Sequence, residues 1–116
     1  MRIVSTMRIV TTRASRTAVL QVLRALAGPL EVKSGLLGCR LCCDVGDANV
    51  LTWTEEWESC EALHAHIRSC AYRSLLEVMD MSASPPLLRF DTVLETAGLE
   101  LVETARSVRI GDCAAE

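Results

Sequence analysis

Aromatic residues are scarce in this chain of 116 residues, which holds two Trp, one Tyr and one Phe. An excess of basic charge is lacking as well, because 12 basic side chains are set against 15 acidic ones and the formal net charge is -3. This balance gives no electrostatic reason to expect a nucleic-acid partner. Half of the residues are apolar, which argues against a disordered chain. The length fits one domain, residues 1–116, with a single core.

Long apolar runs are also missing. Gln21 and Arg24 interrupt the best candidate, so no run approaches the roughly 20 residues that a membrane-spanning helix needs. The same interruption argues against a secretory signal, and we expect a cytoplasmic protein with no membrane partner. The acid-free, Arg-bearing segment before Glu31 has the composition of an organelle transit peptide. We favour the structural interpretation, because the same segment supplies the first strand and helix of the fold.

Nucleotide-binding and hydrolase signatures are absent. The sequence has no Gly-rich phosphate loop, no dinucleotide fingerprint and no Ser-His-Asp arrangement. An enzyme built on this chain would therefore work without a nucleotide cofactor.

Six cysteines raise the question of a metal site or a disulfide. Cys39 and Cys42 have a Cys-x-x-Cys spacing, but the pattern around them predicts a strand, in which Cys39 and Cys43 share one face and Cys42 points the other way. His64 and His66 project about 200° apart on a helix, which is poor for joint chelation. We expect no metal and small buried thiols in a reducing compartment. Whether the three strand cysteines have a redox role stays open.

The most informative segment, residues 51–69, carries both Trp and both His. Residues 51–57 alternate and are rich in Thr and Trp, which predicts a strand with Trp53, Glu55 and Trp57 on one face. A helix follows, for which Ser59 is a good N-cap. Its expected buried stripe consists of Leu63, Ile67, Cys70 and Ser74.

The predicted order of elements is strand, helix, strand, strand, helix, strand, strand. The strands cover residues 2–11, 36–44, 51–57, 87–95 and 99–110, and the helices cover 14–27 and the segment from Ser59 to just before Ser82. Gly28-Pro29 is expected to end the first helix, whose predicted inward residues are Val19, Val22, Leu23 and Leu26. Ala97-Gly98 is expected to turn a final hairpin, and residues 112–116 to form a frayed tail. The motif of Met1–Val4 recurs at Met7–Val10, which indicates either a second start, with residues 1–6 a dispensable extension, or a longer edge strand.

A βαββαβ order predicts the ferredoxin-like fold of the α+β class, with one antiparallel sheet and both helices on one side. Leu51 and Val50 point to opposite faces, so we expect apolar groups on both. The simplest cover for the second face is another copy of the chain, sheet against sheet, which makes a homodimer. A pocket between sheet and helices would be apolar with a few polar groups.

His66 is the first candidate for a functional side chain, because an imidazole at the rim of an apolar pocket can take a proton near neutral pH. The alternative is a structural role, in which the ring donates to a backbone carbonyl or caps the preceding strand. His64 is expected at the surface. Tyr72 is a weaker candidate for ligand contact.

Glu55 is the second candidate, because a carboxylate between two indoles has a raised pKa if it is buried and would suit removal of a phenolic proton. In the alternative interpretation Trp53 and Trp57 anchor the core or a dimer interface. Glu55 would then pair across the sheet with Arg40 or Arg89.

The segment Glu-Glu-Trp-Glu-Ser59 followed by Glu61-Ala-Leu-x-x-His66-x-x-Ser69 resembles the antibiotic biosynthesis monooxygenase (ABM) family, which includes quinol monooxygenases. Residues 34–49, 72–81 and 86–92 are also similar to it. The resemblance implies a dimeric α/β barrel whose characterised members use O2 on electron-rich phenols, anthrones or quinols, with no flavin, haem or metal. His66 matches the His of the family's helix motif.

The leading hypothesis is therefore a homodimeric monooxygenase that needs no cofactor and oxidises a small quinol or phenol. The candidate catalytic residues are His66 and Glu55, and the candidate substrate-binding residues are Trp53, Trp57 and Tyr72. The low aromatic content weakens the case for a polycyclic substrate. A second hypothesis is a non-catalytic, dimeric small-molecule-binding or sensor module. Haem degradation, a third, is weaker because the Asn that such barrels carry in their first strand has no match in residues 2–12.

Overall fold

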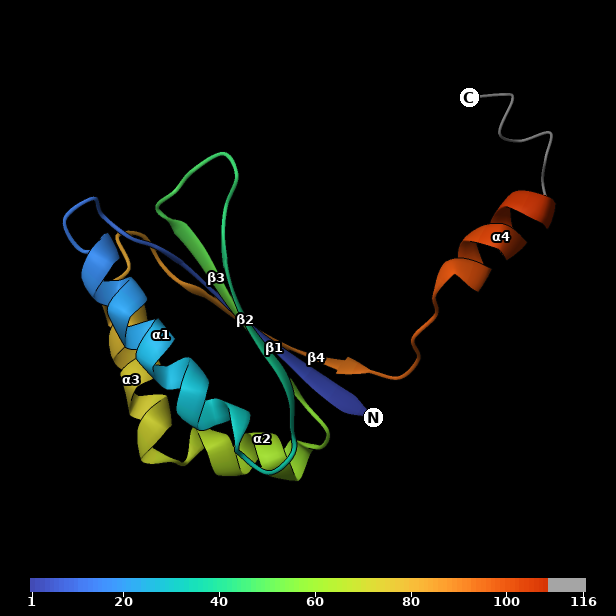
Figure 1. Ribbon diagram of the computed structural model, residues 1–116, viewed down its shortest axis with the longest axis horizontal. Helices are drawn as coiled ribbons and strands as arrows, with labels where there is room; N and C mark the ends of the chain where they lie inside the picture. The colour runs from blue at the N-terminus through green and yellow to red at the C-terminus, as the bar shows by residue number, and fades with distance from the viewer. Residues whose placement is uncertain (109–116) are drawn as a thin grey trace.

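The computed structural model describes residues 1–108 (Figure 1). Its elements are β1 (Arg2–Val10), α1 (Arg16–Glu31), β2 (Leu36–Cys43), β3 (Val50–Trp57), α2 (Cys60–Ile67), α3 (Cys70–Asp80), β4 (Leu87–Val93) and α4 (Leu99–Val108). The four strands pair antiparallel in the order β2-β3-β1-β4. The ferredoxin-like α+β fold with one antiparallel sheet is the one that the sequence predicted, and the sheet of this chain is open.

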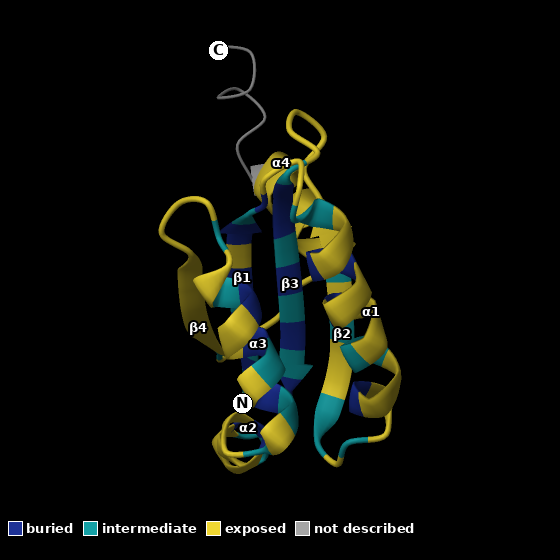
Figure 2. Cartoon of the chain, turned by 90° about the vertical axis from the view of Figure 1, so that its left-hand side faces the viewer, coloured by how far each residue is buried: buried dark blue, intermediate teal, exposed yellow. Residues whose placement is uncertain are grey.

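The two central strands, β1 and β3, alternate between more and less buried residues (Figure 2). In β3 the buried face carries Leu51, Trp53, Glu55 and Trp57, as the pattern in the sequence predicted. The helices α1, α2 and α3 lie on this side of the sheet (Figure 1). The core therefore lies between one sheet face and three helices.

Helix α1 runs one turn beyond its predicted end, because Gly28 and Pro29 lie inside it. The usual clash between a proline and the helical residue before it involves that residue's Cβ, which Gly28 lacks, and Leu30 beyond it is buried in the core. The prediction that Val22 faces inward is wrong, since Val22 is exposed. The buried residues of α1 are Val19, Leu20, Leu23 and Leu30. No helix within residues 1–108 has both the length and the apolar character needed to cross a membrane.

The predicted second helix is in fact two helices, α2 and α3. Ser59 caps α2 as expected, since its Oγ accepts the N–H of Ala62 at 3.1 Å. Ser69 interrupts the helix by donating its hydroxyl to the His66 carbonyl at 2.6 Å, and α3 begins after it. The prediction of one buried stripe that includes Ile67 and Cys70 is therefore wrong, because both residues are exposed. The buried residues are Leu63 and His66 of α2 and Tyr72, Leu75 and Val78 of α3.

The predicted final hairpin is wrong in its second half. Strand β4 ends at Val93, and residues 99–108 form α4 instead of a strand. Glu100 lies in the first turn of α4 and accepts the N–H of Gly98 at 2.8 Å. α4 stands apart from the rest of the chain (Figure 1), and Leu101 is 60% exposed. Residues 109–110 of the predicted strand and the tail at 112–116 lie outside the described residues.

The sheet face away from the helices is more polar than the sequence suggested. Val10 and Val50 pair at one end of it, but its centre is a row in which Arg40, Thr54, Thr6 and Arg89 are paired across four strands. A homodimer through this face stays a prediction, and it would bury a mixed polar surface. Residues 2–6 belong to β1, while their dispensability also stays a prediction.

Candidate functional site

Glu55 lies at the centre of a buried cluster between β3 and α2. Its carboxylate accepts three N–H groups: Nε1 of Trp53 lies 2.7 Å from Oε2, Nε1 of Trp57 lies 2.9 Å from Oε1, and Nε2 of His66 lies 3.2 Å from Oε2. The alternation of β3 puts the three strand residues on one face, so that both indoles reach the same carboxylate. The side chains of Glu55 and His66 are each 1% exposed. The strand and helix motifs found in the sequence thus meet in one site.

Lys33, in the loop between α1 and β2, contacts the other ring nitrogen of His66, with Nζ 3.5 Å from Nδ1. An ammonium group can only donate, so Nδ1 accepts and the ring proton lies on Nε2, which donates to Glu55. His66 is therefore a neutral imidazole in this arrangement. Sequence analysis missed Lys33 because the contact spans 33 positions. The one available signal was that it is the only lysine among the 12 basic residues.

Two aromatic rings hold the imidazole of His66 in place. Trp57 stacks on it, with ring centroids 4.8 Å apart and an interplanar angle of 28°. Tyr72 meets it edge-on, at 5.3 Å and 84°. Tyr72 comes from α3, so the helix break at Ser69 brings a second element to the ring. Of the five residues proposed from the sequence, Trp53, Glu55, Trp57, His66 and Tyr72, the structure brings all five together.

The prediction that Glu55 has a raised pKa is wrong. Burial does raise the pKa of this carboxyl group, but the hydrogen bonds from His66 and both indoles, with the charge that His66 carries when it is protonated, outweigh burial and bring the pKa below its ordinary value of 4.5. Glu55 is therefore ionised at neutral pH. An ionised carboxylate with three donors is a weak base and a strong orienting group.

The interpretation of Trp53 and Trp57 as core anchors is confirmed, since both are buried in the hydrophobic core, while two other interpretations are corrected. Glu55 forms no pair across the sheet with either arginine: Arg40 is paired with Thr54 on the opposite face, and Arg89 bonds Asp91 at 3.0 Å. Nε2–H of His66 donates a hydrogen bond to the Glu55 carboxylate and not to a backbone carbonyl or the end of the strand. His64 is exposed, as expected.

Cys39 on β2 is the register partner of Glu55 and is half-buried. Burial, followed by the charges of Glu55 and Glu31, raises the pKa of its thiol to about 12. A thiol that stays protonated is a poor nucleophile. Burial and the charge of Glu55 also raise the pKa of Tyr72. Within residues 1–108 no three His, Cys, Asp or Glu side chains gather closely enough to hold a metal ion.

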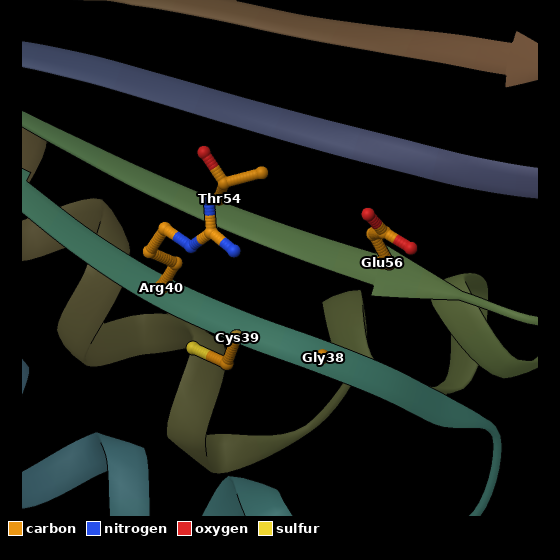
Figure 3. A pocket seen from close by; sticks show the side chains of 5 residues that line it. All are labelled: Gly38, Cys39, Arg40, Thr54 and Glu56. Atoms are coloured by element: carbon orange, nitrogen blue, oxygen red, sulfur yellow. The ribbon is translucent and has the colours of Figure 1, made fainter. Parts of the chain in front are cut away.

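Two hollows open near the cluster on either side of β2. One of about 290 Å³ is lined by Glu31, Leu36, Leu37, Gly38 and Cys39. The other, of about 200 Å³, lies on the uncovered sheet face and is lined by Gly38, Cys39, Arg40, Thr54 and Glu56 (Figure 3). Glu55, His66 and the two indoles line neither hollow. Gly38 and Cys39 line both, and Cys39 is in addition the register partner of Glu55.

Residues 2–78 match the family model described as antibiotic biosynthesis monooxygenase. The match spans more than half of the 116 residues, so the chain belongs to this family. The family resemblance of the strand and helix motifs is thereby confirmed. No curated protein matches the sequence.

Solved structures agree with the fold. Rv0793 from Mycobacterium tuberculosis has 20% identity and a TM-score of 0.75, and the alignment covers 84% of this chain and 100% of that one. A Deinococcus radiodurans protein with a provisional antibiotic-biosynthesis-monooxygenase name has 14% identity, a TM-score of 0.75, and coverage of 83% and 96%. A conserved protein of Methanosarcina mazei Go1 has 14% identity, a TM-score of 0.73, and coverage of 78% and 91%. At these identities the similarity shows the fold alone.

Proposed function

We propose that the chain is a homodimeric monooxygenase that needs no cofactor and oxidises a small quinol or phenol with O2. The observation that carries this proposal is the buried pair of Glu55 and His66. The carboxylate accepts the Nε2–H of the imidazole, with Oε2 3.2 Å from Nε2, which leaves Nδ1 as the nitrogen that can accept a proton. A carboxylate that orients an imidazole in this way is a recurrent arrangement for proton transfer in enzymes. Membership of the ABM family supports the same class of reaction.

The first step is transfer of the phenolic proton to Nδ1 of His66. The imidazolium that forms is stabilised by Glu55, which stays ionised because its pKa is low. Glu55 therefore acts through His66 and not on the substrate, which makes it a positioning residue. Trp57 and Tyr72 keep the ring in place from two sides, and Trp53 helps to hold the carboxylate.

The substrate anion then gives electrons to O2 directly. For a hydroquinone, one oxygen atom of O2 replaces a ring hydrogen as a hydroxyl group and the other leaves as water. The quinol loses four electrons in total and becomes a hydroxyquinone, and O2 gains the same four. The protein supplies orientation, a proton acceptor and a site from which water is excluded.

The test is oxygen uptake by the purified protein with a panel of single-ring quinols, with and without a chelator. We expect uptake above the spontaneous rate that the chelator does not change, and a His66→Ala variant with kcat/KM lower by roughly 10²–10⁴. His64→Ala, an exposed position on the same helix, is the matched control and should behave as wild type. No uptake across the panel from a folded dimer would reject the proposal.

A second candidate is a non-catalytic small-molecule-binding module. It is favoured by one observation: the Glu55 carboxylate already has three donors, and the cluster lines neither hollow. Buried polar groups satisfied in this way can serve folding specificity alone. This candidate predicts ligand binding without oxygen uptake, together with a His66→Ala variant that loses stability and nothing else.

A further inference from the structure

Lys33 occupies the nitrogen of His66 that a substrate hydroxyl would need, with Nζ 3.5 Å from Nδ1. We propose that Lys33 is the substrate-side residue of this site. In the resting protein it keeps His66 neutral and oriented, and when a single-ring phenol displaces it from Nδ1 its ammonium group pairs with the phenolate. This inference rests on the proposed function, which it extends by naming the entry side and the size of the substrate.

The Lys33 backbone is anchored by two hydrogen bonds, while its side-chain contact with His66 is long. The N–H of Lys33 donates to the Leu30 carbonyl at 2.9 Å, and its own carbonyl accepts the N–H of Leu36 at 3.3 Å. Two residues on, Gly35 has φ +86°, and a Cβ there would lie 2.5 Å from the Cβ of Ala62. The loop therefore packs directly against α2, the helix that carries His66. A distance of 3.5 Å is at the long limit of a hydrogen bond, so the flexible lysine head can be displaced at little cost.

The larger of the two hollows lies near the Lys33 loop, but neither Lys33 nor His66 lines it. It has a volume of about 290 Å³ and is lined by Glu31 and Leu36, on either side of Lys33 in sequence, and by Cys39, which is paired with Glu55 across β2 and β3. A cavity of about 150 Å³ holds a benzene ring. A hollow of 290 Å³ therefore suits one substituted ring better than a polycyclic anthrone. Lys33 covers Nδ1 of His66, so the proposal requires a phenol in this hollow to displace the lysine head before it can reach the imidazole.

Charge explains why Lys33 has to move. The ionisable groups around the imidazole are Glu55 from β3, Lys33 from the loop and Tyr72 from α3, and beyond them Cys39 and Glu31 lie towards the hollow. A protonated imidazole and an ammonium group 3.5 Å apart would repel one another. In the proposed step the phenol O–H bond breaks, an N–H bond forms at Nδ1, and no group is oxidised. The ammonium that has left Nδ1 then lies against the new phenolate, so each positive charge has a negative partner.

The experiment uses 4-nitrophenol, because its phenolate is coloured and its neutral form is not. At a pH where the free phenol is mostly protonated, we expect wild-type protein to bind it as the phenolate. Lys33→Met should lower the ionised fraction of the bound phenol about tenfold, and Lys33→Arg, which keeps the charge, should restore most of it. Arg24→Met removes one exposed charge from α1 and is the control that should match wild type. Lys33→Gln gives the same comparison if Lys33→Met does not fold.

The sole lysine gives a second readout, because protein labelled with ¹⁵N-lysine has a single side-chain amine signal. This signal should shift when 4-nitrophenol is added. An ionised fraction in Lys33→Met equal to wild type, or no binding of the phenol by wild type, would overturn the inference. If Lys33→Met ionises the bound phenol as wild type does and still oxidises quinols, the proposed monooxygenase function would remain and Lys33 would have no part in it. If wild type forms the phenolate in a Lys33-dependent way but takes up no oxygen with any quinol, the role of Lys33 would be supported and the proposed monooxygenase function rejected.

Discussion

Nε2 of His66 lies 3.2 Å from Oε2 of Glu55, so a helix residue and a strand residue 11 positions apart form a buried polar pair. Without β3 the buried His66 would lose its carboxylate partner, and without α2 Glu55 would lose one of its three donors. The short connection through Ser59, whose hydroxyl caps α2, sets the helix at the place where the pair closes. The site is therefore as much a part of the folding of the chain as of its proposed chemistry.

Glu55→Gln should destabilise the protein by about 1–3 kcal/mol. An amide offers one oxygen where the carboxylate offers two, and its NH2 group would face an N–H donor of Trp53, Trp57 or His66. Urea unfolding followed by tryptophan fluorescence measures the change, because both indoles lie in the cluster. Glu77→Gln on the exposed side of α3 is the control and should stay within about 0.5 kcal/mol. Equal stability of Glu55→Gln and wild type would show that the three hydrogen bonds contribute nothing net.

The contribution of Glu55 to stability should decrease in acid. A carboxyl group whose pKa is lowered in the folded state contributes stability that is present above its unfolded pKa and is lost as the pH falls through the folded one. The free energy of unfolding of wild type minus that of Glu55→Gln should therefore be constant near neutral pH and shrink below about 4.5. Urea titrations at a series of pH values give this difference. A difference that grows on acidification would mean that burial dominates and the pKa is raised.

Gly35→Ala should cost about 2–4 kcal/mol. The position has φ +86°, and the new methyl group would lie 2.5 Å from the Cβ of Ala62, which cannot rotate away. Gly38→Ala is the matched control, because a Cβ there meets nothing within 4 Å, and it should stay within about 0.5 kcal/mol. Thermal unfolding of the two variants side by side tests the close approach of the loop to α2. Similar melting temperatures would argue against that approach.

The uncovered sheet face should be the interface of a homodimer. Thr6 lies at its centre, between Thr54 and Arg89, so an arginine there would be buried beside another cation. Thr6→Arg should raise the dimer dissociation constant more than tenfold, which is about 1.4 kcal/mol, as measured by sedimentation velocity. Thr17→Arg on the exposed surface of α1 controls for the added charge. A monomeric wild type, or a Thr6→Arg variant that dimerises as wild type does, would rule out this interface.

Local pattern predicted most of what positions the site. The alternation of residues 51–57 correctly predicted that Trp53, Glu55 and Trp57 lie on one face, because the two-residue repeat of a strand depends only on the strand's own sequence. Ser59 was recognisable as a cap for the same local reason. Contacts between distant segments were not accessible in this way. Nothing in the neighbourhood of Lys33 indicates His66, and the pKa of Glu55 could be assigned only once its three donors were known.

Besides the split of the second helix at Ser69, two errors in secondary structure have different causes. At Gly28-Pro29 the usual helix-ending signal was overridden by tertiary packing, since Leu30 gains a place in the core. In residues 99–108 the opening Leu-Glu-Leu alternates like a strand, whereas Leu101, Val102 and Ala105 also fit a helix. No sheet partner is paired with this segment within the described residues, so the helical spacing prevails.

The solitary lysine has a practical meaning for chemical modification. A reagent that acylates amines finds two kinds of target on this chain, the N-terminal amine and Lys33. Coupling through Lys33 would turn its ammonium group into a neutral amide next to Nδ1 of His66. Protein attached to a sensor surface by its amines would thus be a mixture of intact and altered sites, whereas attachment through a terminal tag would leave the site uniform.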